Sequence, residues 1–351
     1  MAADIKRRKD DHLELCATDR VAFRERTTLL ECVRLIHQSL PEARLDEVDL
    51  STHLLGKRLR APIVIAGMTG GTDRAAEINH GLAAIAERRG YGFGLGSQRA
   101  MQKNPDTAWT YEVRKHAPTT LLLGNVGIVQ ARDYQTEVVA GLLRDIGADA
   151  ICLHMNPAME LVQQDGDRDF RGCIDAFSRY VRDLSVPVVA KETGNGVSRD
   201  VAKKLYAAGV RHVDVSGAGG TSWVGVETLR ASDDRKRLGE AFWDWGIPTA
   251  ASVVMVAEAR MRVIATGGIK TGLDIARAIA LGATAAGIAR PCLQAFMDGG
   301  ERGAEAFLVG VENELRAAAL LSGARNMAEL VAVPKIVTGE LREWVAESSM
   351  S

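Results

Sequence analysis

The sequence has few aromatic residues, few cysteines and no long apolar run. Aromatic side chains make up 5% of its 351 residues, and the five cysteines are Cys16, Cys32, Cys152, Cys173 and Cys292. Their odd number and the lack of CxxC spacing argue against a disulfide framework or a zinc site, so we expect small buried hydrophobic side chains there. No run of 18 apolar residues is present, and the N-terminal segment lacks an apolar core followed by a cleavage site. We therefore expect a cytoplasmic protein with no membrane partner.

An excess of charge of either sign is also missing. Lysine and arginine total 44 against 45 aspartates and glutamates, for a net charge of −1. A balanced chain has no general field to attract nucleic acid, so we expect no nucleic-acid partner and look for anion binding in local clusters. The 46% apolar residues, 25% charged residues and 35 glycines are typical of a globular enzyme.

Short apolar, β-branched or glycine-rich runs alternate with segments of helical periodicity, which predicts repeated βα units and a parallel sheet. The predicted strands are Pro62–Gly67, Gly92–Gly96, Thr120–Asn125, Ala150–His154, Pro187–Lys191, His212–Ser216, Val263–Gly267 and Ala285–Ala289. Eight such strands predict an α/β fold, a single (β/α)8 TIM barrel with strands over about residues 62–290. We expect one domain over residues 1–351, with an N-terminal extension and C-terminal helices packed outside the barrel.

The segment between the sixth and seventh predicted strands is longer than a simple crossover requires. Residues 218–262 contain three tryptophans and a charged run. We expect a loop over the barrel mouth followed by a helix.

Polar or glycine residues follow every predicted strand. In this fold such positions face the one open mouth and read as functional, because packed side chains fill the barrel interior. Taken alone, each could be a turn glycine or a helix cap. Their occurrence at all eight strand ends favours a binding site. They include Met68, Thr69, Ser97, Gln98, Arg99, Asn125, His154, Asn156, Glu160, Lys191, Ser216, Thr221, Gly267, Gly268, Ile269 and Arg290.

The loops after the last two strands carry the signature of a phosphate site. Residues 265–272 (ATGGIKTG) and 288–291 (IARP) bring free backbone N–H groups, a lysine and an arginine to the place where such barrels bind phosphate. Lys191, at the end of the fifth strand, is expected to project into the mouth and to stabilise an electron-rich ring or anionic cofactor. In the N-terminal segment, Arg8, Lys9 and His12 form either a solvated charge run or, if they fold over the mouth, a second anion site with Arg99.

At this point the chain resembles the type 2, FMN-dependent isopentenyl-diphosphate isomerases. The resemblance rests on an ordered set of motifs along nearly the whole chain: RKDDH (8–12), GMTGG (67–71), GSQRA (96–100), HMNPAME (154–160), QDGDRDF (164–170), VAKETGNG (189–196), DVSGAGGTSW (214–223) and TGGIKTGLD (266–274). It implies a barrel enzyme that interconverts isopentenyl and dimethylallyl diphosphate with FMN and Mg²⁺. NADPH or NADH would reduce the flavin once, and flavin N5 would be the leading acid/base group.

The resemblance also implies roles for individual positions. FMN would be held by Met68, Thr69, Ser97, Asn125, Lys191, Ser216, Thr221, Gly267, Gly268, Ile269, Ala289 and Arg290. The prenyl diphosphate substrate would be bound by Arg8, Lys9, Ser97, Gln98, Arg99, His154 and Asn156. Glu160 would be the Mg²⁺ ligand, since one carboxylate completed by water and phosphate oxygens is what this ion tolerates. Lys191, His154 and position 159 would act in catalysis.

The chain departs from the family pattern at Met159. The family has a glutamine there, directly before the metal-binding glutamate, and a methionine cannot donate a proton or an amide hydrogen bond. Gln163 and Gln164 lie three and four residues past Glu160 and do not fill that position without a change of register.

Two other functions are compatible with the same residues. One is a net-redox FMN dehydrogenase or oxidase, disfavoured because no catalytic His-Gly-x-Arg pair follows the sixth or seventh strand. The other is a flavin- and diphosphate-binding homologue that has lost catalysis at Met159. For any of the three functions we expect a homo-oligomer.

Overall fold

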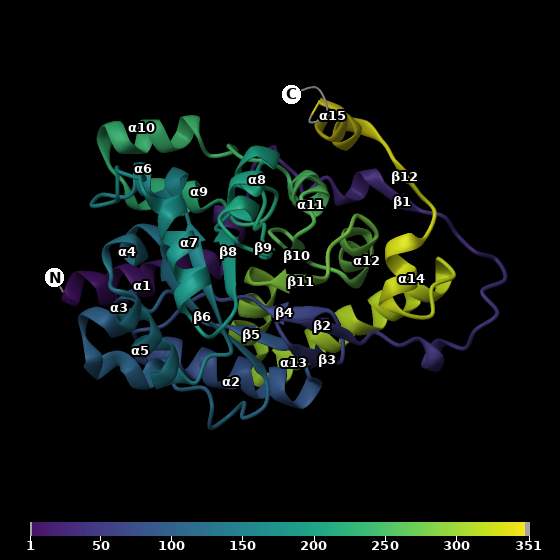
Figure 1. Cartoon of the computed structure of the whole chain (residues 1–351), viewed down its shortest axis with the longest axis horizontal. Coiled ribbons are helices and arrows are strands. Elements are labelled where there is room, and N and C mark those ends of the chain that lie inside the picture. Colours follow the sequence, from purple (N-terminus) through teal and green to yellow (C-terminus); the bar gives the residue numbers. More distant parts are fainter. Residues whose placement is uncertain (1, 348–351) are drawn as a thin grey trace.

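Eight parallel strands close into a barrel at the centre of the computed structural model, which describes residues 2–347 (Figure 1). The barrel strands are β4 (Ile63–Ile65), β5 (Gly92–Gly94), β6 (Leu121–Gly127), β7 (Ala150–Met155), β8 (Val188–Glu192), β9 (His212–Asp214), β10 (Arg262–Thr266) and β11 (Ala285–Ile288). The last strand pairs with the first, with Ile288 opposite Ile65. All eight predicted strands are present, so the prediction of a TIM barrel is confirmed.

Helices surround the barrel and extend beyond it. They are α1 (Ala2–Cys16), α2 (Asp73–Arg89), α3 (Arg99–Lys103), α4 (Ile128–Asp133), α5 (Thr136–Ile146), α6 (Pro157–Val162), α7 (Cys173–Asp183), α8 (Arg199–Ala207), α9 (Trp223–Arg230), α10 (Asp233–Ala241), α11 (Thr249–Glu258), α12 (Gly272–Ala280), α13 (Arg290–Leu321), α14 (Met327–Ala332) and α15 (Gly339–Glu347). Short 3₁₀ helices are η1 (Asp19–Val21), η2 (Leu30–Cys32), η3 (Leu45–Glu47) and η4 (Pro105–Tyr111). No helix among these is both long and apolar enough to cross a bilayer.

Local sequence explains where several helices begin and end. Helix α2 begins at Thr72, whose hydroxyl accepts from the Ala75 N–H, and ends at Gly90 in the left-handed conformation. Helix α12 begins with a capping box in which Thr271 and Asp274 accept from each other's backbone N–H. The Gly272 N–H at the start of α12 donates to the Glu314 carboxylate of α13 at 2.7 Å, so protein side chains already satisfy the backbone donors of residues 270–272 and 274.

A hairpin closes the end of the barrel away from the predicted site. Strands β2 (Thr52–Leu54) and β3 (Lys57–Leu59) carry Leu54 and Leu59 into an apolar cluster with Val64 and Val189 of the barrel strands. At the start of β3, the Lys57 ammonium lies 2.8 Å from the carboxylate of Asp149, the residue that precedes β7. With this end filled, a ligand can enter only from the C-terminal ends of the strands.

Two parts of the chain differ from the sequence-based expectation. Residues 218–262 form three helices, α9, α10 and α11, where one helix after a loop was expected. Near the C-terminus, β12 (Lys335–Val337) pairs antiparallel with β1 (Val33–Leu35), so the C-terminal segment contains a strand as well as the expected helices. This ladder joins segments about 300 residues apart, and strands of three residues give too weak a local signal to be recognised from sequence.

Candidate active site

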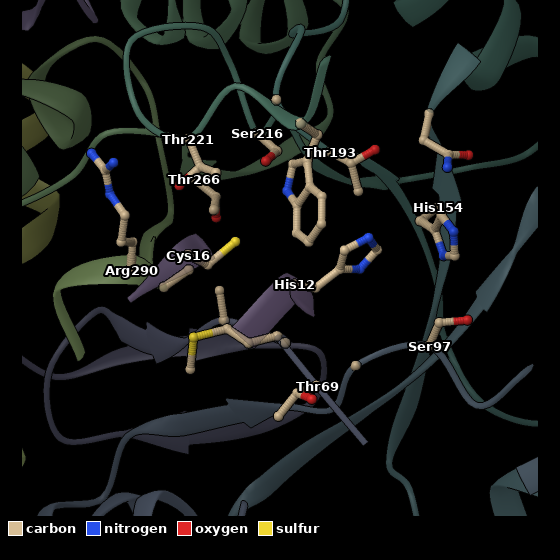
Figure 2. A pocket seen from close by; sticks show the side chains of 18 of the residues that line it. His12, Cys16, Thr69, Ser97, His154, Thr193, Ser216, Thr221, Thr266 and Arg290 are labelled. Carbon is tan, nitrogen blue, oxygen red and sulfur yellow. The ribbon is translucent and has the colours of Figure 1, made fainter. Parts of the chain in front are cut away.

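A cavity opens at the C-terminal ends of the barrel strands and is covered on one side by helix α1. Figure 2 shows His12 and Cys16 of this helix pointing into the cavity, with Arg290 at one end and His154 at the other. Every residue that the sequence assigned to FMN, substrate, Mg²⁺ or catalysis lines the cavity, with one exception. The barrel thus brings together strand ends that are spread over about 220 residues of sequence.

The exception is Gln98, which lies behind the cavity wall. Its side chain is fully buried, its Nε2 donates to the Leu142 carbonyl at 3.1 Å, and its Oε1 accepts from the Asn125 N–H at 3.1 Å. These bonds use both ends of the amide to join neighbouring βα units. Gln98 therefore does not reach the cavity as the sequence motif suggested, because its side chain turns into the barrel wall.

One end of the cavity has the donors expected for a phosphate group. Gly267 and Gly268 both have positive φ, and a Cβ on Gly267 would lie 2.2 Å from the Gly217 carbonyl oxygen, so the loops meet through bare backbone. Helix α13 begins beside them at Arg290 without a side-chain cap, in contrast to the capped α12. An uncapped helix start with an arginine favours an anion at this position.

Several buried polar atoms on the cavity wall lack a partner among the described residues. They are the hydroxyl oxygens of Thr69 and Thr266 and the Nη1 atom of Arg290, which lies 3.7 Å from Asp19 and makes no hydrogen bond. Buried groups of this kind are costly unless a ligand or water satisfies them. An elongated cofactor with a phosphate at one end and a polar ring fits these residues, so the cavity is compatible with FMN.

Lys191 is buried on this wall and is paired with a carboxylate that sequence reasoning missed. Its ammonium donates to Asp214 Oδ2 at 2.8 Å, and both side chains are less than a tenth exposed. Lys191 and Asp214 are direct partners on β8 and β9. Asp214 was within the predicted strand, but only the register of the closed barrel reveals the pair.

His154 lies one strand further along and contacts Asn125, with 2.8 Å between its Nδ1 and Asn125 Oδ1. Burial, together with the positive charges of Lys191, Lys9 and Arg99, lowers the pKa of His154 to about 3. The ring is therefore neutral at pH 7. With Nδ1–H donating to Asn125, Nε2 is an acceptor; if the Asn125 amide is turned over, Nε2–H becomes a donor. The second arrangement is the one that would offer a donor to an anionic ligand.

Glu160 is the carboxylate on the cavity wall, at 5% exposure. Its Oε1 accepts from Asn156 Nδ2 at 2.9 Å, and its Oε2 accepts from the Asp167 N–H at 2.8 Å and from Gln163 Nε2 at 3.3 Å. A carboxylate has about four acceptor positions, so one is left for a cation. No cluster of three or more acidic, histidine or cysteine ligands occurs among the described residues. A Mg²⁺ ion completed by water and phosphate fits this single ligand.

Met159 precedes Glu160 and also lines the cavity, where its sulfur lies 3.6 Å from Asn156 Nδ2. Gln163 lines the cavity as well. From the sequence, Gln163 was expected not to fill position 159 without a change of register. Helix α6 ends at Val162, and Gln163, which follows it, donates through Nε2 to Glu160 at 3.3 Å. Arg168 fixes that loop by donating to the carbonyls of Glu160 and Gln163.

Positive charge gathers where helix α1 meets the barrel. Arg8, Lys9 and Arg99 line the cavity together. Burial, followed by the charges of Arg8 and Arg99, lowers the pKa of Lys9 to about 8. Like charges held this close disfavour one another until an anion joins them. The cluster contradicts the solvated charge run that composition alone left open.

Helix α1 is held in this position by a polar network. His12 Nε2 lies 2.7 Å from Glu227 Oε1, Glu227 Oε2 accepts from Arg230, and Arg230 also donates to Asp11 at 3.2 Å. The His12 ring packs edge-on against Trp223. Trp223 lines the cavity, whereas Glu227 holds helix α1 from outside it. The sequence assigned no role to either residue, because each meets His12 more than 200 residues away on another element.

Comparison with known proteins adds independent information. The FMN-dependent dehydrogenase family matches residues 154–336, just over half of the chain. An isopentenyl-diphosphate delta-isomerase of Methanosarcina mazei is 45% identical, with the match covering 99% of this chain and 96% of that protein. The protein of the same name from Pyrococcus furiosus is 44% identical over 97% of this chain and 89% of its own length, and the one from Methanopyrus kandleri is 41% identical over 97% and 94%.

Solved structures of mandelate oxidase are similar in fold. A variant with a monooxide FMN adduct gives a TM-score of 0.65 at 17% identity, covering 95% of this chain and all of that one. Mandelate oxidase with (S)-2-phenylpropionate gives 0.63 at 18% identity, covering 96% and 98%. At this level of identity the likeness concerns the barrel fold alone.

Proposed function

The chain belongs to the FMN-dependent, type 2 family of isopentenyl-diphosphate delta-isomerases, and on that basis we propose that it interconverts isopentenyl diphosphate and dimethylallyl diphosphate. The observation that carries the proposal is the cavity itself. It combines a phosphate-binding end at Gly268 and Arg290 with a separate cationic cluster at Arg8, Lys9 and Arg99. Two anion sites in one cavity suit a phosphorylated cofactor and a diphosphate substrate bound together.

FMN would occupy the end of the cavity near β10 and β11. Gly267, Gly268 and the start of α13 with Arg290 would bind its phosphate, while Thr69, Thr266 and Lys191 would satisfy its polar ring and chain. When reduced and bound, this cofactor supplies a proton donor and acceptor for the alkene. The protein's own contribution is to bind and orient both molecules and to keep water from the reacting carbons.

The substrate diphosphate would lie against the cationic cluster beneath helix α1. Charge-assisted hydrogen bonds from Arg8, Lys9 and Arg99 would fix it, and His154 would donate through Nε2 once the Asn125 amide has turned. Glu160 would hold Mg²⁺ by its remaining acceptor position, with Asn156 and Gln163 keeping the carboxylate oriented. The alkenyl chain would then extend past Met159, whose apolar side chain suits it.

Met159 is compatible with an active enzyme under this proposal. Bound FMN would supply the acid/base chemistry, so an amide at position 159 would assist without being indispensable. NADPH as the reductant, a homo-oligomeric assembly and a cytoplasmic location stay predictions from the sequence.

A single reaction mixture tests the proposal. The purified protein is incubated anaerobically with FMN, Mg²⁺, NADPH and isopentenyl diphosphate, and dimethylallyl diphosphate is measured. We expect product, and we expect much less after chelation of Mg²⁺ or in the Glu160→Gln variant. Tight binding of FMN and diphosphate with no isomerisation would overturn the proposal in favour of a non-catalytic role. Steady consumption of NADPH in proportion to substrate would instead identify a net-redox enzyme.

A further inference from the structure

Asp214 is a buried acidic residue that lies next to the cavity without lining it. Its strand neighbours place it in a row: His154 on β7 is opposite Lys191 on β8, and Lys191 is opposite Asp214 on β9. Registered partners on parallel strands point to the same side of the sheet, so the three side chains lie next to one another on one face of the sheet.

The hydrogen bonds of Asp214 indicate that its negative charge acts on Lys191 and that the carboxylate does not serve to bind the backbone. Only Oδ2 has a partner, the Lys191 ammonium at 2.8 Å, while Oδ1 is buried without a hydrogen bond among the described residues. The adjacent carboxylate, Glu192, instead accepts from the backbone N–H groups of residues 193–195. A carboxylate that is half satisfied contributes little to stability, and buried ion pairs in general are weak evidence for a stabilising role.

We infer that Asp214 is a positioning residue that holds the Lys191 ammonium at the cavity wall and reduces the positive charge that the bound flavin experiences. Lys191 alone would be a buried, uncompensated cation beside the cofactor. Such a cation favours the more negative, reduced form of a flavin, because opposite charges attract strongly in a dry site. Paired with Asp214, it keeps a donor for the cofactor but contributes little net charge.

The inference rests on FMN binding as proposed above but not on isomerisation. Its test is the midpoint potential of FMN bound to the full-length protein, measured beside FMN affinity and isomerase activity. In Asp214→Asn the size of the side chain is kept and the charge is lost. In this variant we expect the affinity for reduced FMN to increase at least tenfold relative to that for oxidised FMN. This corresponds to a rise of about 30 mV in the midpoint potential of the two-electron couple.

A matched control separates this effect from damage to the barrel. Asp149→Asn removes another carboxylate of the same barrel, one that pairs with Lys57 and Arg114 at the opposite end. We expect it to lower stability and leave the potential unchanged. The separate variant Asp214→Glu keeps the negative charge, so the midpoint potential of its bound FMN should be close to the wild-type value.

A second pair of variants keeps the inference testable if Asp214→Asn does not fold. Lys191→Met should lower the potential, since it leaves Asp214 as an unpaired negative charge, and adding Asp214→Asn should bring it back toward wild type. Replacing both partners of a buried pair is usually tolerated. The inference is overturned if Asp214→Asn has the wild-type potential, or if the double variant matches Lys191→Met. Protein that binds FMN but does not isomerise would refute the proposed function alone, whereas failure to bind FMN would overturn both.

Discussion

Replacing Lys9 by arginine should raise the pH at which the substrate site loses a positive charge. The pKa of Lys9 is lowered from 10.5 to about 8 by burial and by the nearby guanidinium groups of Arg8 and Arg99. Above pH 8 the free enzyme therefore loses this positive charge, whereas the substrate's phosphate groups are already ionised. Since kcat/KM reports the groups of the free enzyme, we expect it to fall from about pH 8 in the wild-type protein.

The size of the fall follows from the contact that is lost. A hydrogen bond to a charged group contributes about 1.5–3 kcal/mol, so kcat/KM should drop by about 10- to 150-fold and then level off. Bound diphosphate raises the pKa of Lys9, so kcat itself should not show the break. Lys9→Arg should stay flat past pH 9, because a guanidinium remains protonated there. Lys9→Ala should already show the reduced value at pH 7.

The assay is initial-rate isomerisation from pH 6.5 to 10, with FMN affinity measured at each pH. Lys103→Ala is the matched control, because the Lys103 side chain lies near Arg99 and Arg8 but does not line the cavity. It should retain the wild-type break near pH 8. A flat wild-type profile, or the same break in Lys9→Arg, would refute the role given to the Lys9 ammonium.

Three further changes have definite expected results. Met159→Gln should raise kcat by less than tenfold; a gain of 10² or more in single-turnover rate would show that the amide is indispensable. Arg290→Ala should weaken FMN binding by about 10- to 150-fold, and an unchanged dissociation constant by flavin fluorescence would place the phosphate elsewhere. His154→Asn should make the free energy of unfolding less dependent on pH in acid. In the wild-type protein the unfolded ring takes up a proton near pH 6.5 and the folded ring only near pH 3. The wild-type free energy of unfolding therefore falls as the pH drops from 6.5 to 3, and the variant lacks this contribution. Urea unfolding at pH 7 and pH 4.5 measures the difference.

The barrel and the membership of the cavity were determined largely by the sequence alone. Parallel strands all end at one edge, so a residue that directly follows a strand must lie at that edge whatever its partners are. Gly267, Arg290 and Lys191 could therefore be assigned to one cavity without knowing any distance between them. The same argument could not predict side-chain direction, which is why Gln98 was assigned to the cavity although it points into the wall.

Only the tertiary structure decided which charges meet. The Lys191–Asp214 pair depends on the register between β8 and β9, and the contact between His12 and Glu227 joins residues 215 positions apart. Neither leaves a local pattern, since each half alone is an ordinary charged residue in an ordinary strand or helix. Whether Arg8 and Lys9 were a solvated run or part of the site likewise depended on where helix α1 packs. Local sequence governs the backbone conformation of short segments, whereas the electrostatics of a site arise from distances between segments, which only the folded chain sets.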